Sequence, residues 1–126
     1  MRGILFRAKR IDNGEWIYGS LVTDDSNHAY IAQIIVGELV TFEVIPETVG
    51  QWTGLTDNNG KKIFEGDIVK FVRKAIVTWH ESLGGFVLFF HPNEKDSSKL
   101  HWMMFDIGVC PYEVIGNIHE NSVGDI

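Results

Sequence analysis

Residues 43 to 70 of the chain read EVIPETVGQWTGLTDNNGKKIFEGDIVK. The stretch contains a proline, four glycines, an Asp-Asn-Asn-Gly turn at residues 57 to 60 and then a Gly-Asp step at residues 66 and 67 into an apolar run. Residues of these types set turns and permit positive φ angles, whereas no two side chains here form a plausible catalytic pair. We therefore interpret the stretch as a backbone path that crosses between two β subdomains.

The stretch carries a structural signature, which consists of Pro46, Gly50, Gly54, Gly60, Gly66 and Asp67. The proline and the first three glycines are expected to hold the backbone where larger side chains would clash. Asp67 and Glu65 straddle Gly66, a spacing that suggests paired carboxylates for acid-base catalysis. Carboxylates at a turn before a strand more often bind local backbone amides, so we predict an architectural role for the whole signature.

Outward from this stretch, alternation of apolar and polar residues with a period of two predicts strands and little helix. One hairpin is expected to join residues 4–9 to 16–21. A second is expected to join residues 30–36 to 39–45 through a type II′ turn at Gly37-Glu38. The expected strands that follow are residues 51–55, 62–64, 68–73, 75–80, 86–91, 100–105 and 112–118.

These elements predict an all-β fold made of two small β subdomains that together form one compact structural unit. The N-terminal subdomain comprises residues 1–50 and the C-terminal subdomain residues 51–126. Closely spaced turn signals favour a small barrel or sandwich, and we predict an SH3-like barrel for residues 60–118.

Charge and cysteine content limit the classes of function. Seventeen acidic and eleven basic side chains give a net charge of −6 and a pI near 5.2, which opposes a large phosphate-binding surface. Cys110 is the only cysteine, so no disulfide can form within the chain. Charges at Arg2 and Arg7 interrupt any signal peptide, and no apolar run is long enough to cross a bilayer. We expect a cytoplasmic protein without membrane contact.

A search for reactive groups finds no strong pattern. The five histidines lack the spacing of zinc sites, and the adjacent pairs His80-Glu81 and His119-Glu120 would point to opposite faces of a strand. Cys110 has no basic neighbour in sequence that would lower its pKa. The glycines at 54 and 60 are not followed by the Lys-Ser or Lys-Thr of a phosphate-binding loop. We predict no catalytic residue, no metal and no cofactor.

Fifteen aromatic residues are a heavy load for a domain of this size. Simple core packing accounts for most of them, but a small β domain has few positions that hide a whole indole, so one or two are expected at an interface. The run His-Trp-Met-Met-Phe at residues 101–105 combines two aromatic side chains with two methionines. From it we select Trp102, Met103, Met104 and Phe105 as possible contacts with a partner.

Three blocks of the sequence resemble the YopX family of small bacteriophage and prophage proteins. They are MRGILFRAKR at residues 1–10, the stretch at 43–70 and EVIGNIHEN at 113–121, and their order and spacing fit the family. The resemblance implies two β subdomains, the second similar to an SH3 barrel, and action in the cytoplasm of a bacterial host. It implies no catalytic residues.

Two functions of different classes remain open at this point. The first is a non-enzymatic protein that binds a host or phage protein or assembles with itself as a homo-oligomer. The alternative is a small nucleic-acid-binding barrel that uses Arg7, Lys9, Arg10 and exposed aromatic side chains, although the net charge disfavours it. A small hydrolase or metal enzyme would need histidines and carboxylates that cluster in a cleft.

Overall fold

The computed structural model describes residues 4–70, 74–82, 84–90, 101–103 and 112–120. These residues form antiparallel strands and one three-residue 3-10 helix, and none of them lies in an α-helix, so the predicted all-β class is confirmed. The chain divides into two compact units, Met1–Trp52 and Thr53–Ile126. The division falls two residues after the boundary expected from sequence, within a strand.

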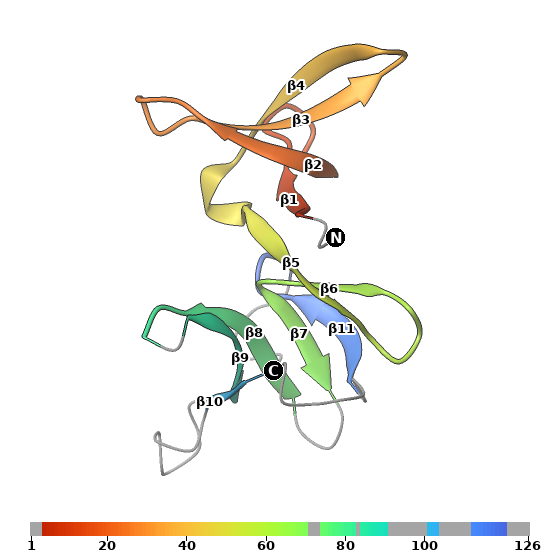
Figure 1. Ribbon diagram of the computed structural model, residues 1–126, viewed down its shortest axis with the longest axis vertical. Coiled ribbons are helices and arrows are strands. Elements are labelled where there is room, and N and C mark those ends of the chain that lie inside the picture. Colours follow the sequence, from red (N-terminus) through yellow and green to blue (C-terminus); the bar gives the residue numbers. More distant parts are fainter. Residues whose placement is uncertain (1–3, 71–73, 83, 91–100, 104–111, 121–126) are drawn as a thin grey trace. The chain divides into compact units, whose positions relative to one another are not determined.

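Unit 1 is an antiparallel sheet with the strand order β4-β3-β2-β1-β5 (Figure 1). A 3-10 turn, η1, leads from β4 into β5 and begins with Pro46, whose fixed φ suits that position. The bounds of the elements are β1 Phe6–Lys9, β2 Trp16–Thr23, β3 Ala29–Ile35, β4 Glu38–Val44, η1 Pro46–Thr48 and β5 Gly50–Thr56.

One face of this sheet forms the core of unit 1, because side chains alternate between the two faces of a strand. Phe6, Leu21, Phe42 and Val49 pack around the fully buried cluster. That cluster consists of Ala8, Ile17, Ala29, Ile31 and Val44. The opposite face carries partly exposed side chains such as Tyr18 and Val22.

Gly19 is the point at which β2 changes partner. Phe6 of β1 pairs with Gly19, whereas the pairing of β2 with β3 begins at Ser20 and Ala32. A Cβ atom on Gly19 would lie 2.4 Å from the carbonyl oxygen of Ala32 and 2.9 Å from Cγ2 of Ile31. Only glycine permits this close approach of β3, and the sequence pattern did not single the residue out.

The glycines of the signature act differently from what the sequence suggested. Gly54 and Gly60 have φ angles of 89° and 82°, and nothing lies within 4 Å of a Cβ built on either residue. Side chains are therefore disfavoured there by backbone conformation and not by crowding. The expectation of a clash at these two positions is wrong.

The loop between β3 and β4 also differs from the prediction. Ile35 pairs with Glu38, so the two central residues are Val36 and Gly37, with φ angles of 50° and 79°. Positive φ at both positions defines a type I′ turn, and not the type II′ turn expected at Gly37-Glu38. A loop at Gly37-Glu38 would shift the register by two residues and set Pro46, which has no N–H, opposite Ala29.

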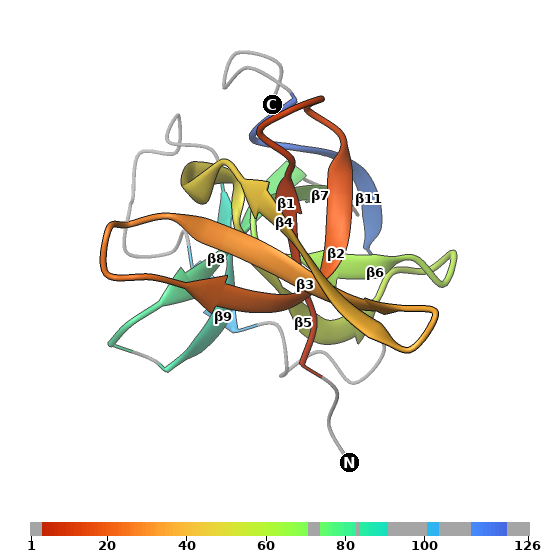
Figure 2. The same cartoon turned by 90° about the horizontal axis from the view of Figure 1, so that it is seen from above.

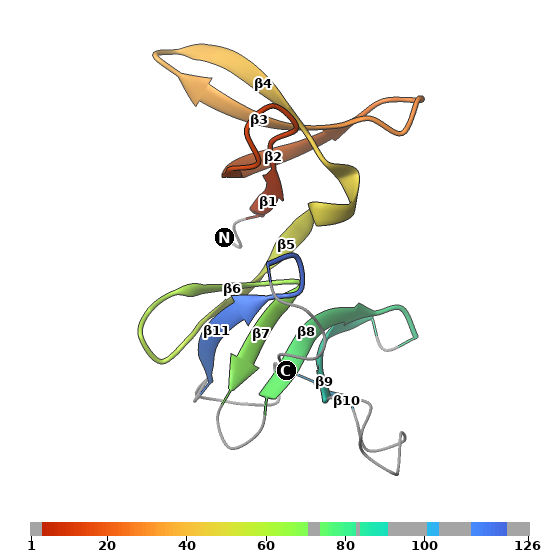
Figure 3. The same ribbon diagram turned by 180° about the vertical axis from the view of Figure 1, so that it is seen from behind.

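In unit 2, a five-stranded antiparallel sheet has the order β10-β9-β8-β7-β11, and β6 lies beside the last part of β5 (Figure 3). The core cluster comprises Ile63, Val69, Ala75, Val77, Leu88 and Tyr112. The bounds are β6 Lys62–Phe64, β7 Asp67–Lys70, β8 Lys74–His80, β9 Gly85–Phe90, β10 His101–Met103 and β11 Glu113–Asn117. Closure into an SH3-like barrel stays a prediction.

Two buried carboxylates organise the turns of unit 2. Asp57 Oδ1 accepts hydrogen bonds from the amides of Asn59 and Lys61 at 2.9 and 2.8 Å, and its Oδ2 accepts one from the amide of Val114 at 3.0 Å. Asp67 accepts one from the amide of Phe64 at 2.7 Å. Asp57 therefore joins the turn between β5 and β6 to the start of β11.

Burial of Asp57 acts to raise the pKa of its carboxyl group. The amides of Val114, Lys61 and Asn59 stabilise the charged form and outweigh burial, so the pKa lies below its ordinary value. This carboxylate has a structural use that accounts for both of its oxygens.

Candidate functional site

The hairpin of β3 and β4 exposes an unusual amount of apolar surface. We define the hairpin patch as Ile34, Ile35, Val36 and Leu39, whose exposed fractions are 69%, 43%, 97% and 68%. Single exposed apolar residues are ordinary, but four large ones within six residues at one hairpin end are a concentration of apolar surface of the kind that marks interaction sites. The two strands run side by side as one hairpin (Figure 2).

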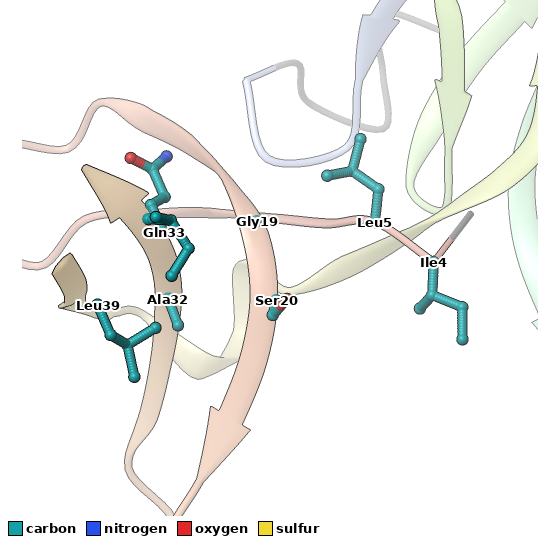
Figure 4. A pocket seen from close by; sticks show the side chains of 8 residues that line it. Ile4, Leu5, Gly19, Ser20, Ala32, Gln33 and Leu39 are labelled. Carbon is teal, nitrogen blue, oxygen red and sulfur yellow. The ribbon is translucent and has the colours of Figure 1, made fainter. Parts of the chain in front are cut away.

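A shallow hollow lies beside this patch on the face of unit 1 opposite its core. Ser20, Ala32 and Leu39 come from three neighbouring strands and line it, together with Ile4 and other residues (Figure 4). Its volume is about 480 Å³. Ile34 also lines the hollow and pairs with Leu39 across the strands, so the patch and the hollow form one continuous surface.

Val36 combines near-complete exposure with an unfavourable backbone conformation. A β-branched residue at a φ of 50° is a conformational outlier, because the left-handed region crowds Cβ against the backbone. Asn or Asp before Gly37 would suit the type I′ turn much better. Burial cannot account for a valine that is 97% exposed. Strain of this kind at a surface position is a reason to look for a function there.

Replacement of Val36 by Asn is expected to raise the stability of the protein by about 1 kcal/mol, because Asn tolerates positive φ and Asn-Gly favours the type I′ turn. The measurement is the urea midpoint of the variant against the wild-type protein. Val22→Asn, also an exposed valine but in a strand, is the control and is expected to bring no gain. A lower midpoint for Val36→Asn would show that the turn is unstrained.

β4 is the edge strand of the unit 1 sheet, and among the residues that the structure describes only part of its edge is open. The carbonyl of Glu43 accepts a hydrogen bond from the amide of Ile11 at 3.1 Å, and the amide of Ile45 donates to the carbonyl of Lys9 at 2.8 Å. These bonds close the end of β4 that lies farther from the turn. Ile35 and Glu38 are the pair next to the two-residue turn and bond to each other. Backbone groups of successive residues in β4 then point alternately toward β3 and away from it. Those of Leu39 and Thr41 therefore point to the open side.

The basic residues of the N-terminus do not gather into one patch. The guanidinium carbon of Arg7 lies 4.7 Å from the ring centre of Trp16, and Nζ of Lys9 lies 5.6 Å from it. Arg10 lies instead over the ring of Phe42, which belongs to the core face, and its Nη2 forms an ion pair of 2.6 Å with Asp12. The structure thus divides the cationic residues considered for nucleic-acid binding between two faces.

The sequence-predicted partner contacts lie elsewhere in the chain. The backbone of Trp102 and Met103 belongs to β10, whereas Met104 and Phe105 lie outside the described residues. The signature residues occupy η1, β5, the β5–β6 turn and the entry to β7. Sequence reasoning missed the hairpin patch. The signal that could have found it is the unbroken apolar run at residues 34–36 beside a tight turn.

Within residues 4–70, 74–82, 84–90, 101–103 and 112–120, no three His, Cys, Asp or Glu side chains lie close enough together to hold a metal ion. No helix in those ranges has the length and hydropathy needed to cross a bilayer. The absence of a catalytic residue, a metal and a cofactor stays a prediction.

Comparisons with known proteins give a consistent assignment. A search of curated proteins finds no match. Among solved structures, the crystal structure of protein EF1440 from Enterococcus faecalis is similar, with a TM-score of 0.51 and 27% sequence identity over 96% of each chain. The family model described as "YopX protein" matches residues 5–123. The chain therefore belongs to the YopX family.

Proposed function

We propose that this chain is a non-enzymatic interaction protein of phage or prophage origin that binds a protein partner through the hairpin patch of unit 1. The partner is a host protein, a phage protein or a further copy of the chain. Membership of the YopX family supports the phage origin. The observation that carries the binding role is Val36, which is strained and exposed at the tip of an apolar hairpin.

Covering the hairpin patch with a partner removes apolar surface from water, which is energetically favourable. Exposed apolar surface contributes roughly 25 cal/mol per Å² when it is removed from water. Ile34, Val36 and Leu39 leave most of their surface in water, so the isolated protein does not obtain this contribution. A partner that covers the tip would obtain it. Aliphatic side chains on a hydrogen-bonded turn also lose little freedom on binding.

Capture from cells tests the proposal. Tagged wild-type, Val36→Asn and Val22→Asn proteins are purified from host cells that also make an untagged copy, and bound proteins are quantified by mass spectrometry. We expect a stoichiometric partner with the wild-type and Val22→Asn proteins, and at least roughly tenfold less of it with Val36→Asn. Because Val36→Asn is expected to be the more stable protein, a loss of capture cannot result from unfolding.

Two outcomes would contradict the proposed function. One is equal capture of the same partner by the wild-type and Val36→Asn proteins, which would place the contact elsewhere. The other is the recovery of no stoichiometric partner from a protein that also stays monomeric on a sizing column.

Nucleic-acid binding is the competing proposal, and a gel shift with single- and double-stranded DNA and RNA at low and high salt separates the two. We expect no salt-dependent shift, because the net charge is −6 and the cationic side chains of Lys9 and Arg10 lie on two different faces. A shift that weakens as salt rises and is lost in Lys9→Ala would favour the nucleic-acid function.

A further inference from the structure

We infer that the partner of the hairpin patch is a second copy of this chain, which pairs antiparallel with the open edge of β4 around a two-fold axis at Leu39. The inference rests on the proposed function, because it names the occupant of the same surface. It is carried by two features: the backbone groups on the edge and the apolar row across the hairpin.

The backbone of β4 selects the place of pairing. Leu39 and Thr41 direct their N–H and C=O groups to the open side, whereas Ile11 and Lys9 close the edge at Glu43 and Ile45. A two-fold axis at Thr41 would bring the second copy against Ile11, which already bonds to Glu43. An axis at Leu39 keeps the copies clear of this closed end. It also lets each Leu39 exchange two hydrogen bonds with its counterpart.

The same axis joins the most exposed strand residues into one row. Ile34 pairs with Leu39 within one chain, so four side chains line up across the paired sheets in the order Ile34, Leu39, Leu39 of the copy and Ile34 of the copy. These two residues are 69% and 68% exposed in the single chain. Cross-strand apolar neighbours of this kind stabilise sheets, and the pairing covers surface that an isolated chain leaves in water.

The register set by this axis is compatible with the charges of a second copy. With Leu39 opposite its counterpart, Glu38 lies opposite Val40 of the copy and diagonal to its Phe42, on the same face of the sheet. The ring of Phe42 carries the guanidinium of Arg10 at 4.7 Å. This guanidinium is already paired with Asp12 at 2.6 Å, so Glu38 lies diagonal to an ion pair, and the register sets no two like charges directly opposite each other.

The edge carries one charged side chain, that of Glu38, but lacks other devices that keep exposed strands apart. Residues 38 to 42 read Glu-Leu-Val-Thr-Phe, with no proline and no lysine, and the pairing of β3 with β4 runs without a bulge. Proteins that must stay monomeric protect open edges with such features. Their absence at an apolar edge is consistent with an edge that is used.

Sedimentation velocity between low and high micromolar concentrations tests the inference. The wild-type protein is expected to form a dimer that dissociates on dilution. Leu39→Lys sets two like charges directly opposite each other and is expected to weaken the dimer at least roughly tenfold. Val22→Lys changes an exposed valine on β2 and should leave the dimer intact. Leu39 is 68% exposed, so the substitution leaves the core of the single chain unchanged.

Cross-linking provides the second readout and reports on the register. In a Cys110→Ser background, Leu39→Cys is expected to form a disulfide-linked dimer under mild oxidation, because directly opposite residues of a hydrogen-bonded pair lie within disulfide range. Val22→Cys is expected to stay unlinked. The inference is overturned if the wild-type protein stays monomeric at the highest concentration, or if the Val22→Cys protein links as readily as the Leu39→Cys protein. If the wild-type protein is monomeric but captures a different partner, and the Val36→Asn protein does not capture it, the inference fails while the proposed function still holds.

Discussion

Replacement of Gly19 by Ala is expected to lower the free energy of unfolding by about 3 kcal/mol, a large effect for the addition of one methyl group. The added Cβ would lie 2.4 Å from the carbonyl oxygen of Ala32, which is a backbone atom that a rotamer change cannot move. Relief requires β2 and β3 to separate at the residue where β2 changes partner.

The measurement combines urea unfolding with hydrogen exchange followed by mass spectrometry. The loss of protection should be strongest in peptides from β2, β3 and β4, because these strands are paired in succession beside Gly19. Ser20→Ala is the matched control. It adds no atoms, removes one exposed hydroxyl and should change stability by less than roughly 0.5 kcal/mol. A midpoint for Gly19→Ala equal to that of Ser20→Ala would show that β3 does not approach Gly19 closely.

Replacement of Asp57 by Ala is expected to cost about 3 kcal/mol, because it removes the acceptor for three backbone N–H groups in a buried position. Two of these groups, those of Asn59 and Lys61, belong to the turn itself, but the third belongs to Val114. The variant should therefore lose protection both in the β5–β6 turn and in β11, which lie far apart in the sequence.

Asp24 provides a matched control in unit 1. Its Oδ1 also accepts hydrogen bonds from two backbone amides, those of Ser26 and His28, but the side chain is exposed to water. Water can replace the lost acceptor, so Asp24→Ala should shift the unfolding midpoint much less than Asp57→Ala. Equal effects of the two substitutions would contradict the joining role of Asp57.

The same carboxylate makes stability depend on pH. The pKa of Asp57 is lowered in the folded protein, so the ionised form contributes stability that is fully present above the ordinary pKa of 3.8. This contribution is lost as the pH falls through the lower, folded pKa. Asp57→Asn should therefore be less stable than wild type at neutral pH, and its stability should fall less than that of wild type as the pH is lowered toward 3. Thermal unfolding across this range measures both differences. If the stability of Asp57→Asn fell as steeply with pH as that of wild type, Asp57 would not be the source of the pH dependence.

The fold was predictable because its elements obey local rules. Period-two alternation predicted β1 to β4 to within two residues at each boundary. Gly60 predicted the turn between β5 and β6, because Asn-Gly favours positive φ. Each of these signals lies in neighbouring residues, so a single sequence displays it.

The candidate site was not predictable in the same way. Gly19 has an ordinary strand pattern around it, and only the approach of β3 shows why no side chain fits. Val36 reads as the end of an apolar strand, and its positive φ follows from the register that pairs Ile35 with Glu38. The sequence pointed instead to residues 101–105, where Trp102 and Phe105 flank two methionines. Exposure depends on long-range packing, which composition does not reveal.

The most direct test of the central claim measures whether the hairpin tip is covered in cells. Val36→Cys and Val22→Cys proteins are labelled with a thiol reagent in intact phage-carrying host cells and, separately, as dilute purified protein. Peptide mass spectrometry then gives the labelling rate of each introduced thiol. We predict labelling at least roughly tenfold slower in cells for the Val36→Cys thiol, with no matching protection of the Val22→Cys thiol. If the ratio of the Val36→Cys labelling rate to the Val22→Cys labelling rate is the same in cells as in dilute solution, the claim that the hairpin patch is the functional surface is contradicted.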